Sequence, residues 1–137
     1  MKILIAEDDL ASRRFLGKLL AQYGEIDLAV DGMEALDAYL IAVKEGSPYN
    51  LICLDIMMPK VDGVKVLKAI RDYEAKKGIV PAYRTRVIMT TALAETDYVR
   101  QAFEIGCEAY AAKPIDIKRF LGVMQKLGLL ADPVLPG

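Results

Sequence analysis

Several residues that could bind a metal ion stand at the ends of short apolar segments. Asp8 and Asp9 follow the first such segment, and Asp55 ends the third. Carboxylates held close together repel one another unless a cation lies among them. Oxygen ligands without histidine or cysteine favour magnesium, which prefers octahedral geometry and keeps several water molecules. The pattern therefore predicts a Mg²⁺ site, at which Mn²⁺ could substitute.

A hydroxyl group and an ammonium group follow the last two apolar segments. Thr91 comes at the end of the fourth segment, and Lys113 comes after the fifth. An ammonium group offsets the charge of phosphoryl oxygens, and a threonine hydroxyl can donate a hydrogen bond to one of them. Phosphoryl transfer requires mainly positioning and charge neutralisation. A carboxylate, a metal ion and a lysine are therefore sufficient to accept a phosphoryl group.

Strand-like apolar segments alternate with helical patterns along the whole chain. The helical patterns have apolar residues at spacings of three and four, and most are followed by a glycine. Strands are expected at residues 2–6, 26–30, 51–54, 86–90 and 108–112, and helices around residues 15–23, 33–43, 64–70, 98–103 and 117–127. The third helix is expected to fray into the polar stretch 72–77.

This alternation predicts the α/β fold class, a flavodoxin-like (βα)5 doubly wound parallel sheet. Right-handed crossovers favour the strand order 2-1-3-4-5, and ligands then bind outside the carboxyl ends of the strands. The polar residues described above should therefore meet at one edge. We expect a single domain over residues 1–130 and a tail over residues 131–137. The connection over residues 72–85 lies at the opposite edge and is expected to be a surface elaboration.

The composition excludes several classes of function. The net charge of the 137 residues is −1, so no excess of lysine and arginine supports general nucleic-acid binding. The absence of histidine excludes Ser-His-Asp catalysis and a phosphohistidine role. Residues 38–43, the longest apolar stretch, are too few to cross a bilayer, and no secretion signal is visible, so we expect a cytoplasmic location. Cys53 and Cys107 are expected to be small buried hydrophobes.

Four segments together resemble the receiver domain of two-component response regulators, over nearly the whole chain. They are ILIAEDD at the start, LICLDIMMPKVDG in the middle, VIMTTA, and YAAKPI near the end. The resemblance implies that Asp55 is the phosphoacceptor, that Asp9 binds the metal directly and that Asp8 binds it through water. It also implies that the backbone carbonyl of Met57 is a further metal ligand.

The same resemblance assigns residues around the phosphoryl group. Thr91 becomes the switch hydroxyl, Lys113 the phosphate-binding lysine and Tyr110 the switch aromatic. Three further positions are implied to be structural, the last of them after a cis peptide bond: Pro59, Gly63 and Pro114.

A receiver domain implies a signalling switch and not an enzyme. A sensor histidine kinase, a His-containing phosphotransfer protein or a small phosphodonor would phosphorylate Asp55 in the presence of Mg²⁺. Thr91 would then move towards the phosphoryl group and Tyr110 would turn inward, which changes the surface of the fourth helix, fifth strand and fifth helix. The expected protein is a stand-alone receiver that signals to a separate effector or relays phosphate onward. We expect a monomer or a phosphorylation-dependent dimer, without direct nucleic-acid binding or membrane insertion.

Some of these residues have alternative roles. Asp8 and Asp9 could be helix N-caps, which is the commoner role of aspartate before a helix. Thr90 competes with Thr91, because neighbouring strand residues face opposite sides of a sheet, and the resemblance selects Thr91. Glu7 is expected to contribute charge without binding the metal.

Two other functions fit parts of the pattern. A phosphatase of the haloacid-dehalogenase type also uses an aspartate nucleophile, but it needs a second aspartate two residues later, where this chain has Met57. A phosphorylation-independent interaction module on the same fold would not need the polar residues at the strand ends. Met57 and Leu93 lie two residues after Asp55 and Thr91, and their apolar side chains cannot orient water, so we expect slow autodephosphorylation.

Overall fold

The computed structural model describes residues 1–92 and 97–131, so Leu93 and nearly all of the tail predicted over residues 131–137 lie outside the described residues. The strands are β1 (Lys2–Ala6), β2 (Glu25–Ala29), β3 (Leu51–Asp55), β4 (Arg86–Thr91) and β5 (Ala109–Ala112). The helices are α1 (Leu10–Leu20), α2 (Gly32–Lys44), α3 (Gly63–Lys76), α4 (Asp97–Ile105) and α5 (Ile117–Lys126), with a 3-10 turn η1 (Pro81–Tyr83) before β4. Within the described ranges, no helix is long and apolar enough to cross a membrane.

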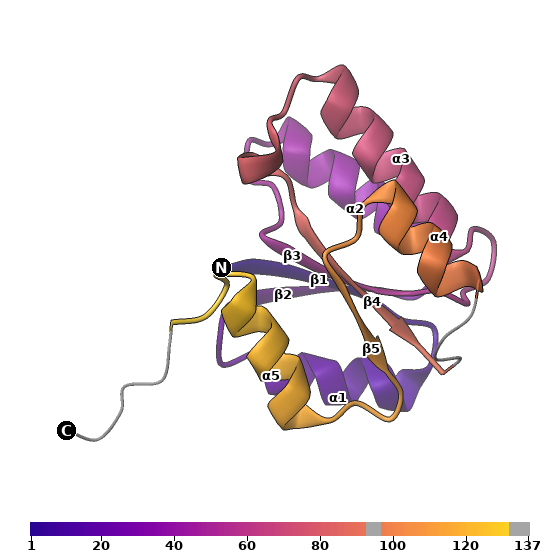
Figure 1. The fold of residues 1–137 in the computed structure, drawn as a ribbon, viewed down its shortest axis with the longest axis vertical. Coiled ribbons are helices and arrows are strands. Elements are labelled where there is room, and N and C mark those ends of the chain that lie inside the picture. The colour runs from indigo at the N-terminus through magenta and orange to yellow at the C-terminus, as the bar shows by residue number, and fades with distance from the viewer. Residues whose placement is uncertain (93–96, 132–137) are drawn as a thin grey trace.

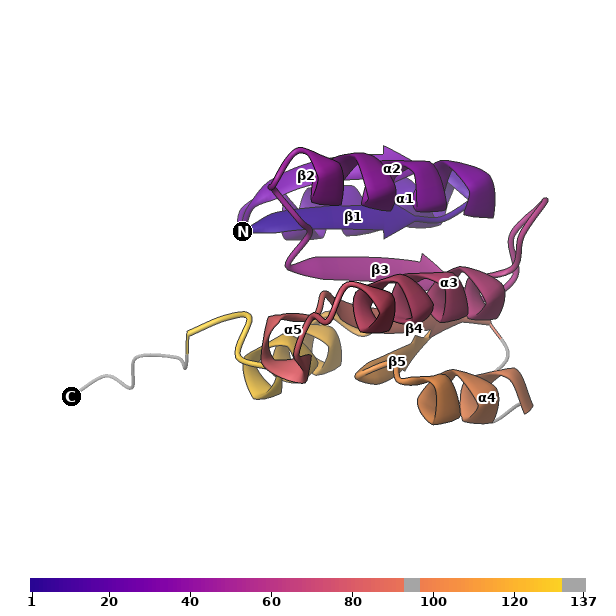
Figure 2. The same ribbon diagram turned by 90° about the horizontal axis from the view of Figure 1, so that it is seen from above.

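The strands form one parallel sheet in the order β2-β1-β3-β4-β5, which confirms the predicted flavodoxin-like topology. Helices α2, α3 and α4 cover one face of the sheet, and α1 and α5 cover the other (Figure 1). Seen from above, the labelled strands run in the same direction, so their carboxyl ends share one edge (Figure 2).

The alternation of side chains along the central strands divides the core into two layers. Ile52 and Leu54 of β3 belong to the layer under α2, α3 and α4, whereas Leu51 and Cys53 belong to the layer under α1 and α5. Strands buried on both faces are apolar at successive positions, which is why they could be recognised in the sequence. Cys53 and Cys107 are both buried free thiols, and burial raises their pKa values to about 12 and about 11.

Helices α1, α2, α3 and α5 each begin directly after an aspartate that caps the helix. Each capping carboxylate accepts a hydrogen bond from the backbone amide three residues later. Such a cap typically stabilises a helix by about 1 kcal/mol. Because helices follow the carboxyl ends of the strands, the caps fix the helix starts around one edge of the sheet. The capping residues are Asp9, Asp31, Asp62 and Asp116.

The prediction that α3 frays from residue 72 is wrong, because polar residues on its last turns are buried in ion pairs. Arg71 is 7% exposed and Glu74 is 2% exposed. Arg71 Nη1 lies 2.6 Å from Glu74 Oε1, and Arg71 Nη2 donates to both carboxylate oxygens of Glu108 at 3.0 and 2.9 Å. The amide of Thr85 donates to Glu74 Oε2 at 2.9 Å. In the last turns of α3, buried charged residues therefore occupy the positions that apolar residues usually take on the buried face of a helix.

Candidate functional site

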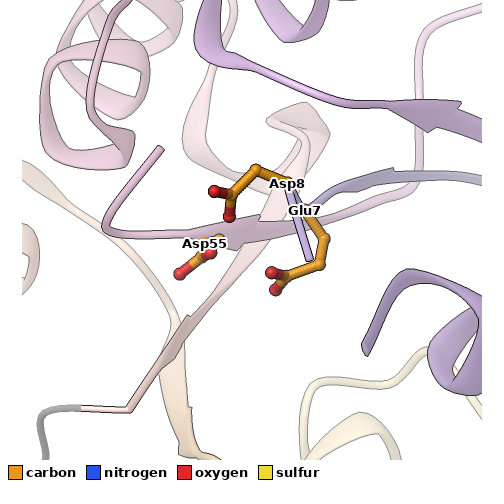
Figure 3. A group of neighbouring side chains, drawn as sticks. All are labelled: Glu7, Asp8 and Asp55. Carbon is orange, nitrogen blue, oxygen red and sulfur yellow. The ribbon is translucent and has the colours of Figure 1, made fainter. Parts of the chain in front are cut away.

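The carboxyl ends of four strands bring charged and hydroxyl-bearing residues to one edge of the sheet. Glu7 follows β1, Asp55 ends β3, Thr91 ends β4 and Lys113 follows β5. Figure 3 shows the side chains of Glu7, Asp8 and Asp55 turned towards a common space. Asp8, Asp55 and Lys113 therefore lie together as expected, with Glu7 in addition.

The carboxylates of Glu7, Asp8 and Asp55 form a compact acidic group. One oxygen of each lies within 4.8 Å of the others. Glu7 is completely buried and Asp55 is 4% exposed, whereas Asp8 is exposed to solvent. A set of oxygen donors with one side open to water has the chemistry that a hard divalent cation requires. The residues present therefore fit Mg²⁺.

Lys113 partly neutralises this acidic group. Its Nζ lies 2.6 Å from Glu7 Oε2 and 3.2 Å from Asp55 Oδ2. Burial alone would lower the pKa of Lys113, but hydrogen bonds and charges from Glu7 and Asp55 outweigh burial and raise it. The peptide bond from Lys113 to Pro114 is cis, as expected, and the amide of Lys113 donates to the carbonyl of Thr91 at 2.8 Å.

The carboxyl group of Asp55 has a raised pKa. Burial, together with a hydrogen bond and the charge of Glu7, raises the pKa of Asp55 to about 7, although Lys113 acts in the opposite direction. A single ammonium group cannot neutralise three neighbouring carboxylates. Additional positive charge is therefore favoured at this position.

Asp9 does not join the acidic group, although the sequence led us to expect it as the direct metal ligand. Its carboxylate turns to the start of α1 and accepts a hydrogen bond from the amide of Ser12 at 2.8 Å. This backbone hydrogen bond is the main reason that the pKa of Asp9 is lowered. The amide of Asp9 in turn donates to Glu7 Oε1 at 3.1 Å. Asp9 thus has the capping role, and Glu7 takes its place in the group.

A signal for Glu7 was available in the strand pattern. The amide of Glu7 donates to the carbonyl of Ala29 at 3.0 Å, so the pairing between β1 and β2 continues one residue beyond β1. Side chains alternate along a strand, so Glu7 lies on the same face as Ile5. If the first strand is taken to continue to residue 7, Glu7 faces the site and Asp9 lies at the start of the helix, where it can act as the cap.

The loop after Asp55 is held by close backbone contacts. A Cβ atom on Gly63 would lie 2.1 Å from the carbonyl oxygen of Asp55, so only glycine fits there. The carbonyl of Pro59 accepts a hydrogen bond from the amide of Val61 at 2.8 Å, which closes a tight turn. The amide of Met57 donates to Asp55 Oδ1 at 3.3 Å, and the Met57 side chain is 51% exposed. Pro59 and Gly63 thus shape the loop that carries the Met57 carbonyl.

Thr90 and Thr91 are both buried, but they lie on opposite faces of the sheet. Asp55 pairs with Thr90 in the strand register, so these two side chains share a face. Thr91 alternates with Thr90 and shares the other face with Met89, which pairs with Tyr110. The Tyr110 ring is 37% exposed and packs edge-on against Phe103 of α4, with ring centroids 6.0 Å apart. Thr91 and Tyr110 therefore occupy the face that α4 covers.

In a doubly wound sheet, ligands bind outside the carboxyl ends of the strands, where this chain has the acidic group and Lys113. The chain belongs to the response regulator receiver domain family, whose model matches residues 3–125. Over 123 residues it is 29% identical to chemotaxis protein CheY of Treponema pallidum, an alignment that covers 88% of this chain and 77% of that protein. Over 131 residues it is 33% identical to probable histidine kinase 2 of Oryza sativa, covering 88% of this chain and 12% of the kinase.

Solved structures extend the comparison. The chain superimposes on a protein of the CheX-CheY-BeF3-Mg complex from Borrelia burgdorferi with a TM-score of 0.79 and 26% identity, covering 93% of this chain and 89% of that one. It also matches a chain of the complex between Ypd1 and the Ssk1 receiver domain of Saccharomyces cerevisiae, with a TM-score of 0.76 and 27% identity over 96% and 93% of the two chains. The histidine kinases among its relatives are much longer, and the chain spans 4–12% of their length.

Proposed function

We propose that this receiver accepts a phosphoryl group on Asp55 in a Mg²⁺-dependent reaction. The observation that carries the proposal is the buried Asp55 carboxylate with Lys113 Nζ at 3.2 Å and two further carboxylates within 4.8 Å. In the transfer, the bond between phosphorus and the donor breaks as a bond forms to a carboxylate oxygen of Asp55. Lys113 offsets the charge on the phosphoryl oxygens.

The residues that would hold the metal are Asp8, Asp55 and the Met57 carbonyl, with Glu7 beside them. This set replaces Asp9 by Glu7 relative to the sequence-based expectation, because the Asp9 carboxylate is engaged at the start of α1. A bound divalent ion would supply the positive charge that Lys113 alone cannot provide. Mn²⁺ has similar ligand preferences and should substitute.

We further propose that phosphorylation is signalled through Thr91 and Tyr110. Both lie on the sheet face covered by α4, and Tyr110 is partly exposed beside Phe103. Movement of the Thr91 hydroxyl towards the phosphoryl group would leave space on this face, and Tyr110 would turn into it. The surface of α4, β5 and α5 would then present a different shape to a separate effector.

The proposed phosphodonor is a histidine kinase or a His-containing phosphotransfer protein. Apolar side chains around the acidic edge support docking of a protein donor: Leu10, Met57 and Ile117 are 50%, 51% and 46% exposed. Relatives include histidine kinases, and one structural neighbour is a receiver bound to a phosphotransfer protein. We propose that the chain acts as a switch or relay and not as a phosphatase, because Met57 cannot exchange a proton at the position where a phosphatase needs one.

The test is phosphorylation by acetyl phosphate, followed by measurement of the intact mass. The parent protein should gain one phosphoryl group in the presence of Mg²⁺ and none in EDTA. Asp55→Asn should gain none, whereas Asp72→Asn, an exposed aspartate on α3, should behave like the parent. An equal gain in Asp55→Asn would identify another acceptor. No gain in the parent would favour a phosphorylation-independent interaction module.

A further inference from the structure

The connection between α3 and β4 helps to form a recess at the sheet edge opposite to Asp55. The recess has a volume of about 380 Å³, within the range of small-molecule sites. Its walls come from the loop before β3, from the segment around η1, and from the residues that follow α5. The lining residues used below are Tyr49, Tyr83, Arg84 and Arg86.

Three basic residues, Lys2, Arg84 and Arg86, gather at this recess, and the charges of Asp27, Glu25 and Glu45 act on Tyr49 in its wall. Arg86 Nη1 donates to the carbonyls of Pro81 and Arg84, at 3.4 and 3.1 Å, and not to a carboxylate. Arg84 lies 3.9 Å from Glu108, the limit of an ion pair, and its buried Nε has no hydrogen-bond partner among the described residues. Lys2 packs over the Tyr49 ring at 4.8 Å. Arginine forks of this kind match the oxygens of phosphate and carboxylate groups.

The carboxylates beside the recess are engaged elsewhere. Glu108 binds Arg71 with both oxygens and accepts a further hydrogen bond from the amide of Val87 at 2.6 Å. Asp27 accepts a hydrogen bond from the hydroxyl of Tyr49 at 2.7 Å. Glu108 is thus paired with Arg71, whereas Asp27 has only a neutral donor and keeps its charge.

Buried contacts hold the arginines in place. Arg71 Nη1 donates to the carbonyl of Thr85 at 2.9 Å, and the Thr85 hydroxyl donates to the carbonyl of Tyr49 at 2.8 Å. Thr85, between the two arginines, is 3% exposed. The backbone of residues 84–86 is thus fixed by a charged network behind it, and a rigid support is what a specific binding site requires.

We propose that this recess binds a phosphate-bearing ligand about the size of a mononucleotide. The phosphate pairs with Arg84 and Arg86, and the ring of Tyr83, which is 82% exposed, supplies a stacking face for a planar group. The connection is then a ligand-binding element and not merely a surface elaboration. The proposal is independent of phosphorylation, because Asp55 lies at the other end of the strands.

The probe is adenosine monophosphate, added to the isotope-labelled full chain in EDTA and followed by the NMR shifts of backbone amides. We expect saturable shifts at residues 49–50, 82–86 and 127–129. Inorganic phosphate should bind at the same amides more weakly, and adenosine should bind least. Loss of the arginine contact in Arg86→Gln should weaken binding about tenfold or more. Tyr83→Ala should weaken the nucleotide but not inorganic phosphate.

Arg14→Gln, which removes an exposed arginine on α1, is the matched control and should bind like the parent. Thermal melting of Arg86→Gln checks its fold, and the largely exposed Tyr83 gives a variant that does not depend on that check. The proposal is overturned if the parent shows no saturable shift, if shifts appear equally in Arg86→Gln, or if adenosine binds as tightly as the nucleotide.

Discussion

Glu7, Asp8 and Asp55 set three carboxylates against one ammonium group, that of Lys113. Asp8 can be hydrated, but Glu7 and Asp55 are buried, so their repulsion is not screened by water. Without a metal ion, this repulsion therefore lowers the stability of the folded protein, and the same carboxylates are the groups that can bind a cation. Two predictions follow from single residues of this group, and a third concerns the neighbouring Met57.

Asp55→Asn should stabilise the metal-free protein, and the gain should grow with pH. Burial raises the folded-state pKa of Asp55 to about 7, from an ordinary value of 3.8. Between these two pH values the unfolded chain is ionised at Asp55 while the folded protein holds the proton, so stability falls as pH rises through this window. Above about pH 7 the variant should be more stable by on the order of 2 kcal/mol.

The measurement is urea unfolding in EDTA at about pH 5, which lies within this window, and at about pH 8, which lies above it. The parent should lose stability between the two pH values by more than the variant does. Mg²⁺ should stabilise the parent at the higher pH and should leave Asp55→Asn nearly unchanged. Equal pH dependence in both proteins would refute the role given to Asp55.

Two adjacent aspartates should respond differently to the same isosteric change. Asp8→Asn removes a carboxylate from the acidic group and should weaken Mg²⁺ binding about tenfold or more. Asp9→Asn should change Mg²⁺ affinity little, because asparagine caps a helix about as well as aspartate. The shift of the melting temperature with Mg²⁺ concentration measures both affinities. The reverse result would restore Asp9 as the direct ligand.

Met57→Asn should shorten the lifetime of phosphorylated Asp55. The Met57 side chain is half-exposed beside the acceptor and cannot hydrogen-bond to an attacking water molecule, whereas asparagine can. We expect hydrolysis to be faster by about threefold or more, since positioning of a reactant by hydrogen bonds contributes at least this much in many sites. The rate is measured as the decrease over time in the fraction of protein that carries the added phosphoryl mass. An unchanged or longer lifetime in Met57→Asn would contradict this role of Met57.

At the scale of elements, the strands were predictable and the end of α3 was not. β3 is buried at every position, and such a strand appears in the sequence as an uninterrupted apolar run. The last turns of α3 bury Arg71 and Glu74, which a search for apolar periodicity cannot recognise. Their partners, Glu108 and Thr85, are distant in the sequence, so only the fold brings them together.

The ends of the strands decide which of the predicted site residues lie together. Asp55 and Thr91 end their strands and Lys113 follows β5, so the topology alone brought them to one edge. The choice between Glu7 and Asp9 depended on whether β1 pairing extends by one residue. A one-residue difference at a strand end decides which carboxylate faces the site and which caps the helix.

The start of α2 should control the loop that carries Met57. A Cβ atom on Gly32 would lie 2.0 Å from the carbonyl oxygen of Val61, and Lys60 Nζ lies 3.3 Å from Asp31 Oδ2. Gly32→Ala should therefore displace the loop, cost about 1–3 kcal/mol of stability and weaken Mg²⁺ binding. The measurements are thermal unfolding and the Mg²⁺ dependence of the melting temperature.

Gly17→Ala is the matched control, because a Cβ atom on this α1 residue would meet nothing within 4 Å. It should stabilise the protein by about 0.5–1 kcal/mol through helix propensity and leave Mg²⁺ affinity unchanged. If both substitutions stabilised the protein and neither changed Mg²⁺ affinity, the contact between α2 and the loop would not position the site.

At the scale of the whole molecule, the two edges of the sheet carry different charged groups. The carboxyl edge has the acidic group and the amino edge has Arg84 and Arg86. Strand β4 joins the edges, running from Arg86 to Thr91. Because the central strands β1, β3 and β4 are buried on both faces, they should act as a rigid frame. A change at the acidic edge should therefore travel along the surface of α4 and β5 and not through the central strands.

This view predicts where hydrogen exchange changes when the acceptor is occupied. With Mg²⁺ and beryllofluoride, a mimic of the phosphoryl group, amides in the loop after Asp55 should become protected by direct contact. Amides of α4 and β5 around Phe103 and Tyr110 should also change, because the ring packing on this face is replaced. Amides of residues 49–50 and 127–129 at the opposite edge should stay as they were.

Asp55→Asn should show none of these changes. A response confined to the loop after Asp55 would mean that Thr91 and Tyr110 do not form a switch, whereas a response at the opposite edge would mean that β4 transmits the signal between the two edges.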